Sequence, residues 1–304
     1  MRTHLPHLSK QQVIQLAKLI EKVLLVLQPE LIWCLGTRTT IMQDWSCFWP
    51  GEGYRETIFP PTFDLMILTT DTEKRPEYEL IQLIEQQAAS LPCEITCMVQ
   101  KYAAFMEGLP AGYRFDTTVY RKAVPVYSSG KPLTAELPGE LTKEEMKTRI
   151  TTQWNRCFTT AQRFFKTAID CQQDNWPEQA VFNLHQAAQH TCMAILRGIT
   201  GYRSTTHNLS RLLALIDNFS MEPSVIFPRL TREETELFSL LNKAYSDARY
   251  KEDYTVSAEK AAILIDRIKE LMFVAESLYQ AKLQELDKDQ PIVFPITTTH
   301  ETTA

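Results

Sequence analysis

Apolar residues recur every three or four positions over several long stretches of this chain, and such spacing predicts helices. In the N-terminal half these stretches alternate with short, continuously apolar runs that are typical of buried strands. Alternation of the two patterns predicts a small α/β domain. We expect helices at about 9–27, 75–89 and 102–108, and strands at 31–35, 63–68, 93–99 and 123–127.

From residue 142 onward only the helical spacing remains. Thr142 with Glu145, and Thr231 with Glu234, form capping-box patterns that mark helix starts. Five helices in succession predict an antiparallel bundle. The expected helices span about 142–171, 175–198, 207–218, 231–249 and 257–286.

These patterns predict an α+β protein of two domains. The turn-forming residues that follow the last expected strand indicate a linker, and the threonine-rich C-terminus indicates a frayed tail. We expect an α/β domain at 1–128, a linker at 129–141, a helical bundle at 142–288 and a flexible tail at 289–304.

The segment 41–61 interrupts the α/β pattern and is rich in aromatic residues and proline. Two interpretations stay open: the aromatic side chains form a local satellite core, or they form a lid that faces a partner. An exposed aromatic cluster of this kind would mark an interface.

The bulk composition narrows the possible partners. The 304 residues carry a net charge of −5, which argues against a strongly electropositive protein that binds double-stranded DNA. No run approaches the roughly 20 apolar residues of a membrane span, and the first 30 residues do not resemble a signal peptide. The seven cysteines are scattered without a second pair at metal-ligand spacing, so we expect buried free thiols, no metal site and a cytoplasmic location.

Three separated segments of the helical half resemble the HEPN domain family: Ala180–His190, Gly201–Leu209 and Ser246–Tyr254. This resemblance implies a helical bundle that binds nucleotide or RNA and forms a homodimer. Many members of the family are metal-independent ribonucleases with an arginine followed, four to six residues later, by a histidine. The resemblance also implies a link to toxin–antitoxin, phage-defence or mobile-element functions.

Arg249 occupies the place of the family's arginine, and Tyr254 stands where the histidine is expected. Because a tyrosine titrates near 10, Tyr254 is a poor general base at neutral pH. The resemblance therefore implies a binding cleft around Arg249, Tyr250 and Tyr254 without efficient catalysis. Cleavage by Arg249 with Tyr254 is the alternative. A simpler interpretation is that Arg249 is a solvated residue that pairs with Asp247, Glu252 or Asp253.

Other side chains of the helical half are candidates for the same cleft. His185 and Gln189 lie one helical turn apart, so they share a face that can look toward Arg249. Arg203 and His207 fall in an expected loop and form a candidate anion site. The alternatives are hydrogen bonds to helix ends and loops for the first pair, and a contact at the start of a helix for the second.

Two patterns in the N-terminal half resemble the minimal nucleotidyltransferases that often accompany HEPN domains. Gly36-Thr37 ends the first expected strand, Asp64 lies on the next strand, and Glu94 on the following one. In that family a Gly-Ser turn approaches a triphosphate, and Asp-x-Asp with a third acid holds Mg²⁺. The resemblance implies Mg²⁺-dependent nucleotidyl transfer as a further alternative function.

The second acid of this pattern is missing. Alternate residues of a strand share a face, and the neighbours of Asp64 on that face are Thr62 and Met66. A single carboxylate holds Mg²⁺ poorly, so we expect a degenerate domain that uses no cofactor. An ion pair between Asp64 and Arg38 is the simpler interpretation of the lone acid.

Overall fold

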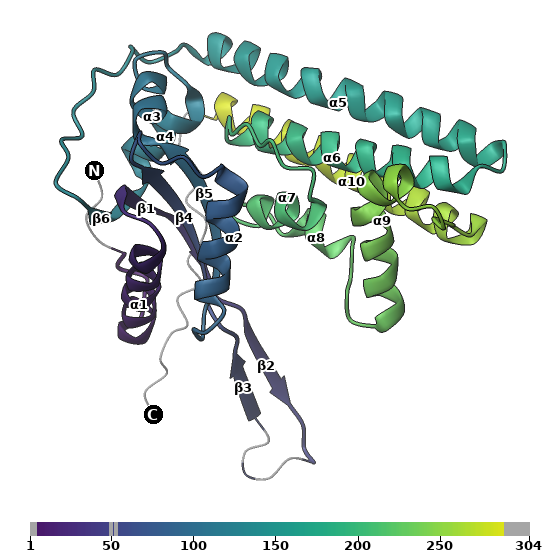
Figure 1. Cartoon of the computed structure of the whole chain (residues 1–304), viewed down its shortest axis with the longest axis horizontal. Coiled ribbons are helices and arrows are strands. Elements are labelled where there is room, and N and C mark those ends of the chain that lie inside the picture. Colours follow the sequence, from purple (N-terminus) through teal and green to yellow (C-terminus); the bar gives the residue numbers. More distant parts are fainter. Residues whose placement is uncertain (1–4, 49–50, 52–53, 289–304) are drawn as a thin grey trace. The chain divides into compact units, whose positions relative to one another are not determined.

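A computed structural model describes residues 5–48, 51 and 54–288 of the chain (Figure 1). The described residues form two compact units. Unit 1 contains the described residues up to Gly139 together with Leu213–Ser224, and unit 2 contains Glu140–Leu212 together with the described residues from Val225 onward. The expected tail at 289–304 lies outside the described residues.

Unit 1 is built around a mixed four-stranded sheet with the strand order β5-β4-β1-β6. Strands β4 and β5 are parallel, and the other two pairs are antiparallel. Its elements are α1 (Lys10–Val26), β1 (Pro29–Arg38), β2 (Ile41–Trp45), β3 (Tyr54–Ile58), β4 (Thr62–Thr69), α2 (Glu77–Ala88), β5 (Glu94–Lys101), α3 (Tyr102–Gly108), α4 (Arg114–Lys122) and β6 (Val124–Ser128).

The two faces of the sheet bury different side chains because successive residues of a strand point to opposite sides. Phe63, Leu65 and Ile67 of β4 belong to the core cluster that α1 and α2 cover. Trp33 of β1 points to the other face, where its ring centroid lies 4.9 Å from that of Phe105 in α3. Both faces are therefore apolar, as the uninterrupted apolar runs predicted.

The aromatic insertion forms a hairpin of β2 and β3 that extends away from the four-stranded sheet (Figure 1). Ile41 pairs with Ile58 and Trp45 with Tyr54, so these four side chains share one face. All four are more than half exposed. The satellite-core interpretation is therefore wrong for the described residues of this segment. Neither strand of the hairpin was predicted from the sequence, and α4 was not predicted either.

Unit 2 is helical, and its capping boxes form as the sequence predicted. The Thr142 side chain accepts a hydrogen bond from the Glu145 backbone N–H, and Thr231 does the same for Glu234. The helices are α5 (Lys143–Gln173), α6 (Pro177–Ile199), α7 (Leu209–Ile216), α8 (Glu222–Val225), α9 (Arg232–Tyr250) and α10 (Ala258–Asp287), of which α7 and α8 also contribute residues to unit 1.

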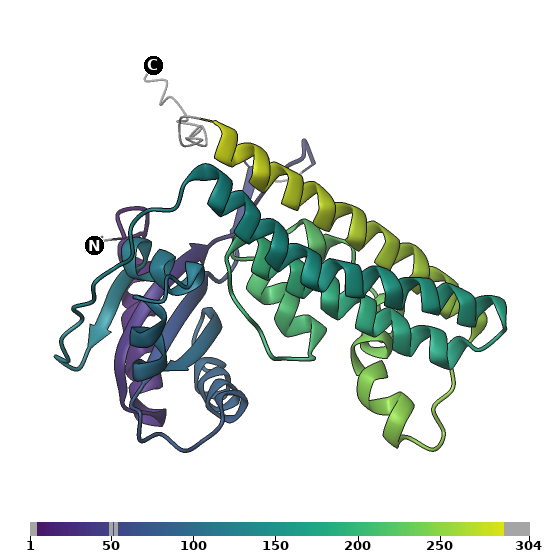
Figure 2. The ribbon, with the colours of Figure 1, turned by 90° about the horizontal axis from the view of Figure 1, so that it is seen from above.

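Helices α5, α6 and α10 run side by side, in teal, green and yellow in Figure 2, and α9 packs against α6. Trp154 of α5 anchors their interface: its ring stacks on Tyr279 at 4.5 Å and on Phe158 at 4.5 Å. Gly198 of α6 lets the indole approach, because a Cβ there would lie 3.2 Å from the Trp154 ring. Phe158, Trp154 and Tyr279 thus form one aromatic stack in the core of this unit.

Most cysteines are buried free thiols, as expected, but Cys47 is exposed. Among the described residues, no three His, Cys, Asp or Glu side chains gather into a group that could hold a metal ion. No described helix combines the length and the apolar character that crossing a membrane requires.

Candidate functional site

Helix α6 places His185 and Gln189 on its buried face, one turn apart as predicted, with exposed fractions of 0% and 3%. The Nδ1 atom of His185 lies 3.0 Å from the backbone oxygen of Leu241 in α9. Burial lowers the pKa of His185 to about 4, so its imidazole is neutral and Nδ1–H donates to that oxygen. The Nε2 atom of His185 is buried and has no hydrogen-bond partner among the described residues.

His207 precedes α7 and forms a hydrogen bond with Gln189 of α6: the Gln189 Oε1 lies 3.1 Å from the His207 Nδ1. The His207 ring also stacks on Tyr245 of α9, at 4.4 Å between centroids and 8° between planes. Because the amide oxygen only accepts, Nδ1–H of the exposed His207 imidazole donates in this contact.

Arg249 lies in the last turn of α9 and packs on the same tyrosine. Its Nε donates to the Tyr245 backbone oxygen at 2.8 Å, and its Cζ lies 3.7 Å from the centre of the Tyr245 ring. Within the described residues Arg249 makes no ion pair with Asp247, Glu252 or Asp253. The ion-pair alternative is therefore wrong: the exposed guanidinium lies on an aromatic ring rather than beside a carboxylate.

Arg249 and Tyr254 line a common pocket of about 400 Å³ together with Glu178, Asn183 and Lys251. The Tyr254 hydroxyl is buried without a hydrogen-bond partner among the described residues. Burial, with smaller contributions from Asp247 and Glu178, raises the pKa of Tyr254 to about 12. Tyr254 therefore keeps its proton near neutral pH and can serve this pocket as a donor rather than as a base.

The other predicted binding residues do not line this pocket: Tyr250, Arg203, His185, Gln189 and His207. Tyr250 is 79% exposed, and its ring centre lies 5.5 Å from the Arg249 Cζ. Arg203 is exposed and near enough to Cys157 to act on that thiol electrostatically. The structure gives Arg203 no direct contact with His207, and an anion site between the two residues stays a prediction.

In unit 1 the structure brings Gly36 and Asp64 together, since they are opposite one another in the β1–β4 ladder. Asp64 is 2% exposed, and Arg38 Nη2 lies 3.4 Å from its Oδ1, as the simpler interpretation predicted. Thr37 is opposite the core residue Phe63, and its hydroxyl contacts Nε2 of His7 at 2.9 Å. Thr37 and Asp64 thus belong to opposite faces of the sheet.

Glu94 does not meet Asp64 either. In the parallel ladder Glu94 is opposite Thr62, whose hydroxyl donates to its Oε2 at 3.3 Å, and Thr96 is opposite Asp64. Asp64 is therefore flanked by Thr96 and Arg38 rather than by Glu94, and the carboxylate that acts on it electrostatically is that of Asp217.

Asn218, which follows α7, is a neighbour of Asp64 that was not predicted from the sequence. A Cβ on Gly36 would lie 2.7 Å from the Asn218 Nδ2, so the glycine admits this amide. Burial raises the pKa of Asp64 to about 6, while Arg38, Asn218 and Thr96 favour the carboxylate and limit the rise. Asn218 lies far from Asp64 in the sequence, and no local sequence pattern predicts that the two residues lie close together.

Asp64 is expected to make unit 1 less stable as pH rises from 4 to 7. Its pKa in the folded protein lies above the unfolded value, so the folded state binds the proton more tightly and loses this advantage as the pH passes through about 6. In the Asp64→Asn variant, the decrease in unfolding free energy between pH 4.5 and pH 7 should be smaller than in the wild type by on the order of 2 kcal/mol. Urea titrations of both proteins at pH 4.5 and 7 check this, and parallel pH profiles would contradict it.

Residues 154–278 match the family model described as HEPN domain. The matched stretch begins within α5 and ends within α10, so it contains every helical-unit residue of the pocket and of the His207–Tyr245–Arg249 cluster. A search of curated proteins gave no match for the chain. The HEPN match confirms the resemblance of the helical half, and the nucleotidyltransferase resemblance of the other half stays a prediction.

Proposed function

We propose that the helical unit binds nucleotide or single-stranded RNA in the pocket of Arg249 and Tyr254, without efficient catalysis. The HEPN match supports a role connected with nucleotides or RNA in general. The observation that carries the finer proposal is the position of the exposed Arg249 guanidinium, which lies on the Tyr245 ring and lines the pocket without a carboxylate partner among the described residues.

The chemistry of the pocket suits a phosphodiester. A guanidinium offers a planar set of donors that matches two phosphate oxygens. The Tyr254 hydroxyl supplies one more donor, and Lys251 a second positive charge. Tyr250, exposed beside Arg249, offers a face on which an unpaired base can stack.

The proposal includes a homodimer through the helical unit and a role in toxin–antitoxin, phage-defence or mobile-element biology. Both rest on analogy with the HEPN family rather than on a contact in this chain. Nucleotidyl transfer is not part of the proposal, because Asp64 stands without a second acid on its strand.

Metal-independent RNA cleavage is a second candidate, which the arrangement of His207 favours. In this reaction Nε2 of His207 accepts the proton of a 2′-hydroxyl, and the 2′-oxygen attacks the phosphorus. The bond to the 5′-oxygen breaks, which leaves a 2′,3′-cyclic phosphate and a 5′-hydroxyl whose proton comes from water. Arg249 neutralises the charge that develops on the phosphate. Gln189 would hold the imidazole through its Nδ1–H. Tyr254, with its raised pKa, could not take the place of His207 as the base.

Arg249→Ala is expected to weaken binding of a fluorescently labelled single-stranded RNA by at least about tenfold, because a charge-assisted hydrogen bond contributes roughly 1.5–3 kcal/mol. Fluorescence anisotropy measures the dissociation constant. Arg232→Ala is the matched control: it removes an arginine of the same helix that is 91% exposed in its side chain and pairs with Glu236. Equal affinity of the Arg249→Ala variant and the control would refute the pocket, as would a wild-type protein that does not bind RNA.

Gel analysis of the same incubations, with and without EDTA, separates the two candidates. Intact RNA at every protein concentration supports binding alone. Fragments that persist in EDTA and disappear in His207→Ala would replace the binding proposal with the cleavage mechanism.

A further inference from the structure

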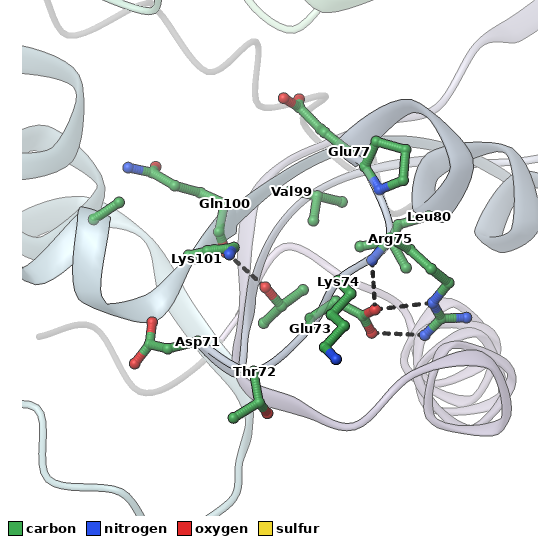
Figure 3. Close-up of a pocket in the computed structure, with 13 residues that line it drawn as sticks. Asp71, Thr72, Glu73, Lys74, Arg75, Glu77, Leu80, Val99, Gln100 and Lys101 are labelled. Atoms are coloured by element: carbon green, nitrogen blue, oxygen red, sulfur yellow. Dashed lines mark hydrogen bonds and ion pairs between the residues drawn. The ribbon is translucent and has the colours of Figure 1, made fainter.

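Unit 1 contains a hollow of about 720 Å³ where the parallel strands β4 and β5 end (Figure 3). The segment Asp71–Glu77 forms one wall, and Gln100, Lys101 and Ala104 form another. Open α/β sheets commonly bind their ligands beyond the carboxyl ends of strands. Neither the HEPN match nor the Asp64 cluster involves this hollow, and the sequence patterns did not single it out.

The walls of the hollow are held in place by contacts that also engage two of its acids. Arg75 donates to both carboxylate oxygens of Glu73, at 3.0 and 2.7 Å, as the dashed lines of Figure 3 show. The same guanidinium donates to the backbone oxygen of Val26 at the end of α1, at 3.3 Å. Asp71 accepts a hydrogen bond from the Ala103 backbone N–H at 2.8 Å. The site is thus shaped before any ligand arrives.

Two lysines that line the hollow have no partner for their side chains among the described residues. Lys74 and Lys101 are exposed lining residues, and their side chains make no hydrogen bond or ion pair within the described part of the chain. Lys131 lies 3.8 Å from Asp71 and offsets its charge further. Glu77 is the third acid of the lining. Since Asp71 and Glu73 already have partners, the available charge favours an anion over a cation.

The floor of the hollow is apolar. Leu80 of α2 is 1% exposed and Val99 of β5 is 8% exposed, and both line the hollow from the core side. Small-molecule sites combine such an apolar surface with a few placed polar groups, in volumes of roughly 300–1,000 Å³. Two lysines above an apolar floor match a molecule with a charged head and an apolar body.

We propose that this hollow binds a small molecule with a dianionic head group, such as a phosphate monoester, on an apolar or ring-bearing body. Lys74 and Lys101 hold the head group, and Leu80 and Val99 contact the body. The site is independent of RNA binding by the helical unit.

Isothermal titration of the full chain with phenyl phosphate tests the site. Phenyl phosphate should bind, and inorganic phosphate should bind more weakly because it lacks the ring. The double variant Lys74→Gln/Lys101→Gln should bind phenyl phosphate at least about tenfold more weakly, since two charge-assisted contacts are lost. Benzyl alcohol, which has the ring without the charge, should give no heat of binding.

The matched control is Lys10→Gln/Lys18→Gln, which removes the same charge from exposed positions of α1 that do not line the hollow. This variant should keep the wild-type affinity. An equal loss in both double variants would show general surface attraction and overturn the site. No binding by the wild-type protein at millimolar phenyl phosphate, or equal affinity for phenyl phosphate and inorganic phosphate, would overturn the proposal as well.

Discussion

Replacement of Trp154 by alanine is expected to destabilise the helical unit by about 3–5 kcal/mol, the usual cost of emptying a buried tryptophan site. The indole is 3% exposed and stacks on both Phe158 and Tyr279. The substitution would leave a cavity that neighbouring side chains cannot readily fill, because Gly198, which lies against the indole, has no side chain. This loss is a large share of the stability of a typical domain.

Circular dichroism at 222 nm during urea unfolding measures this effect, because the helical unit supplies most of the helix signal. Trp176→Ala is the matched control, since Trp176 is 56% exposed before α6. The control should change the unfolding free energy by less than about 1 kcal/mol. A Trp154→Ala protein as stable as the control would contradict the packing that the structure gives.

Gly108→Ala is expected to destabilise unit 1 by roughly 1–3 kcal/mol through overpacking. A Cβ at this position would lie 2.0 Å from Oδ2 of Asp116 and 3.0 Å from the Tyr113 ring. Asp116 is 4% exposed, so its carboxyl group cannot turn freely into water, and the same burial raises its pKa to about 7. The sign is diagnostic, since alanine in place of glycine ordinarily stabilises a helix by about 0.5–1 kcal/mol.

A double-mutant cycle isolates this overlap. In an Asp116→Ala background the oxygen that blocks the new methyl group is absent, so Gly108→Ala should cost less than about 0.5 kcal/mol there. Urea unfolding of the four proteins supplies the cycle. The same cost in both backgrounds would mean that Asp116 does not limit the space beside Gly108.

The sequence predicted the elements whose hydrophobic spacing is long or continuous. The helix from Lys10 and the strand through Phe63 were confirmed, because apolar periodicity and capping residues are local signals. The β2–β3 hairpin was missed because its residues, such as Trp45 and Tyr54, face solvent and show no buried face. Helix α4 was missed because only Asp116 and Val119 of its nine residues are buried.

For the candidate site, spacing on one helix was enough to place His185 and Gln189 together, one turn apart. The contact of Gln189 with His207, and the shared stacking of His207 and Arg249 on Tyr245, join three elements and leave no trace in local spacing. The family resemblance supplied Arg249, but only the geometry shows that Arg249 and the loop residue His207 both stack on the Tyr245 ring.

The segment Leu213–Ser224 belongs to unit 1 although it lies within the HEPN match. On the ribosome, where chains emerge from the N-terminus, residues up to Gly139 leave the exit tunnel well before Asn218 does. Until then Asp64 and Gly36 lack the neighbour that covers them in the finished protein. A nascent chain stalled at residue 200 therefore contains all four strands of the sheet but lacks Asn218, so Asp64 and Gly36 stay uncovered until the last third of the chain is made.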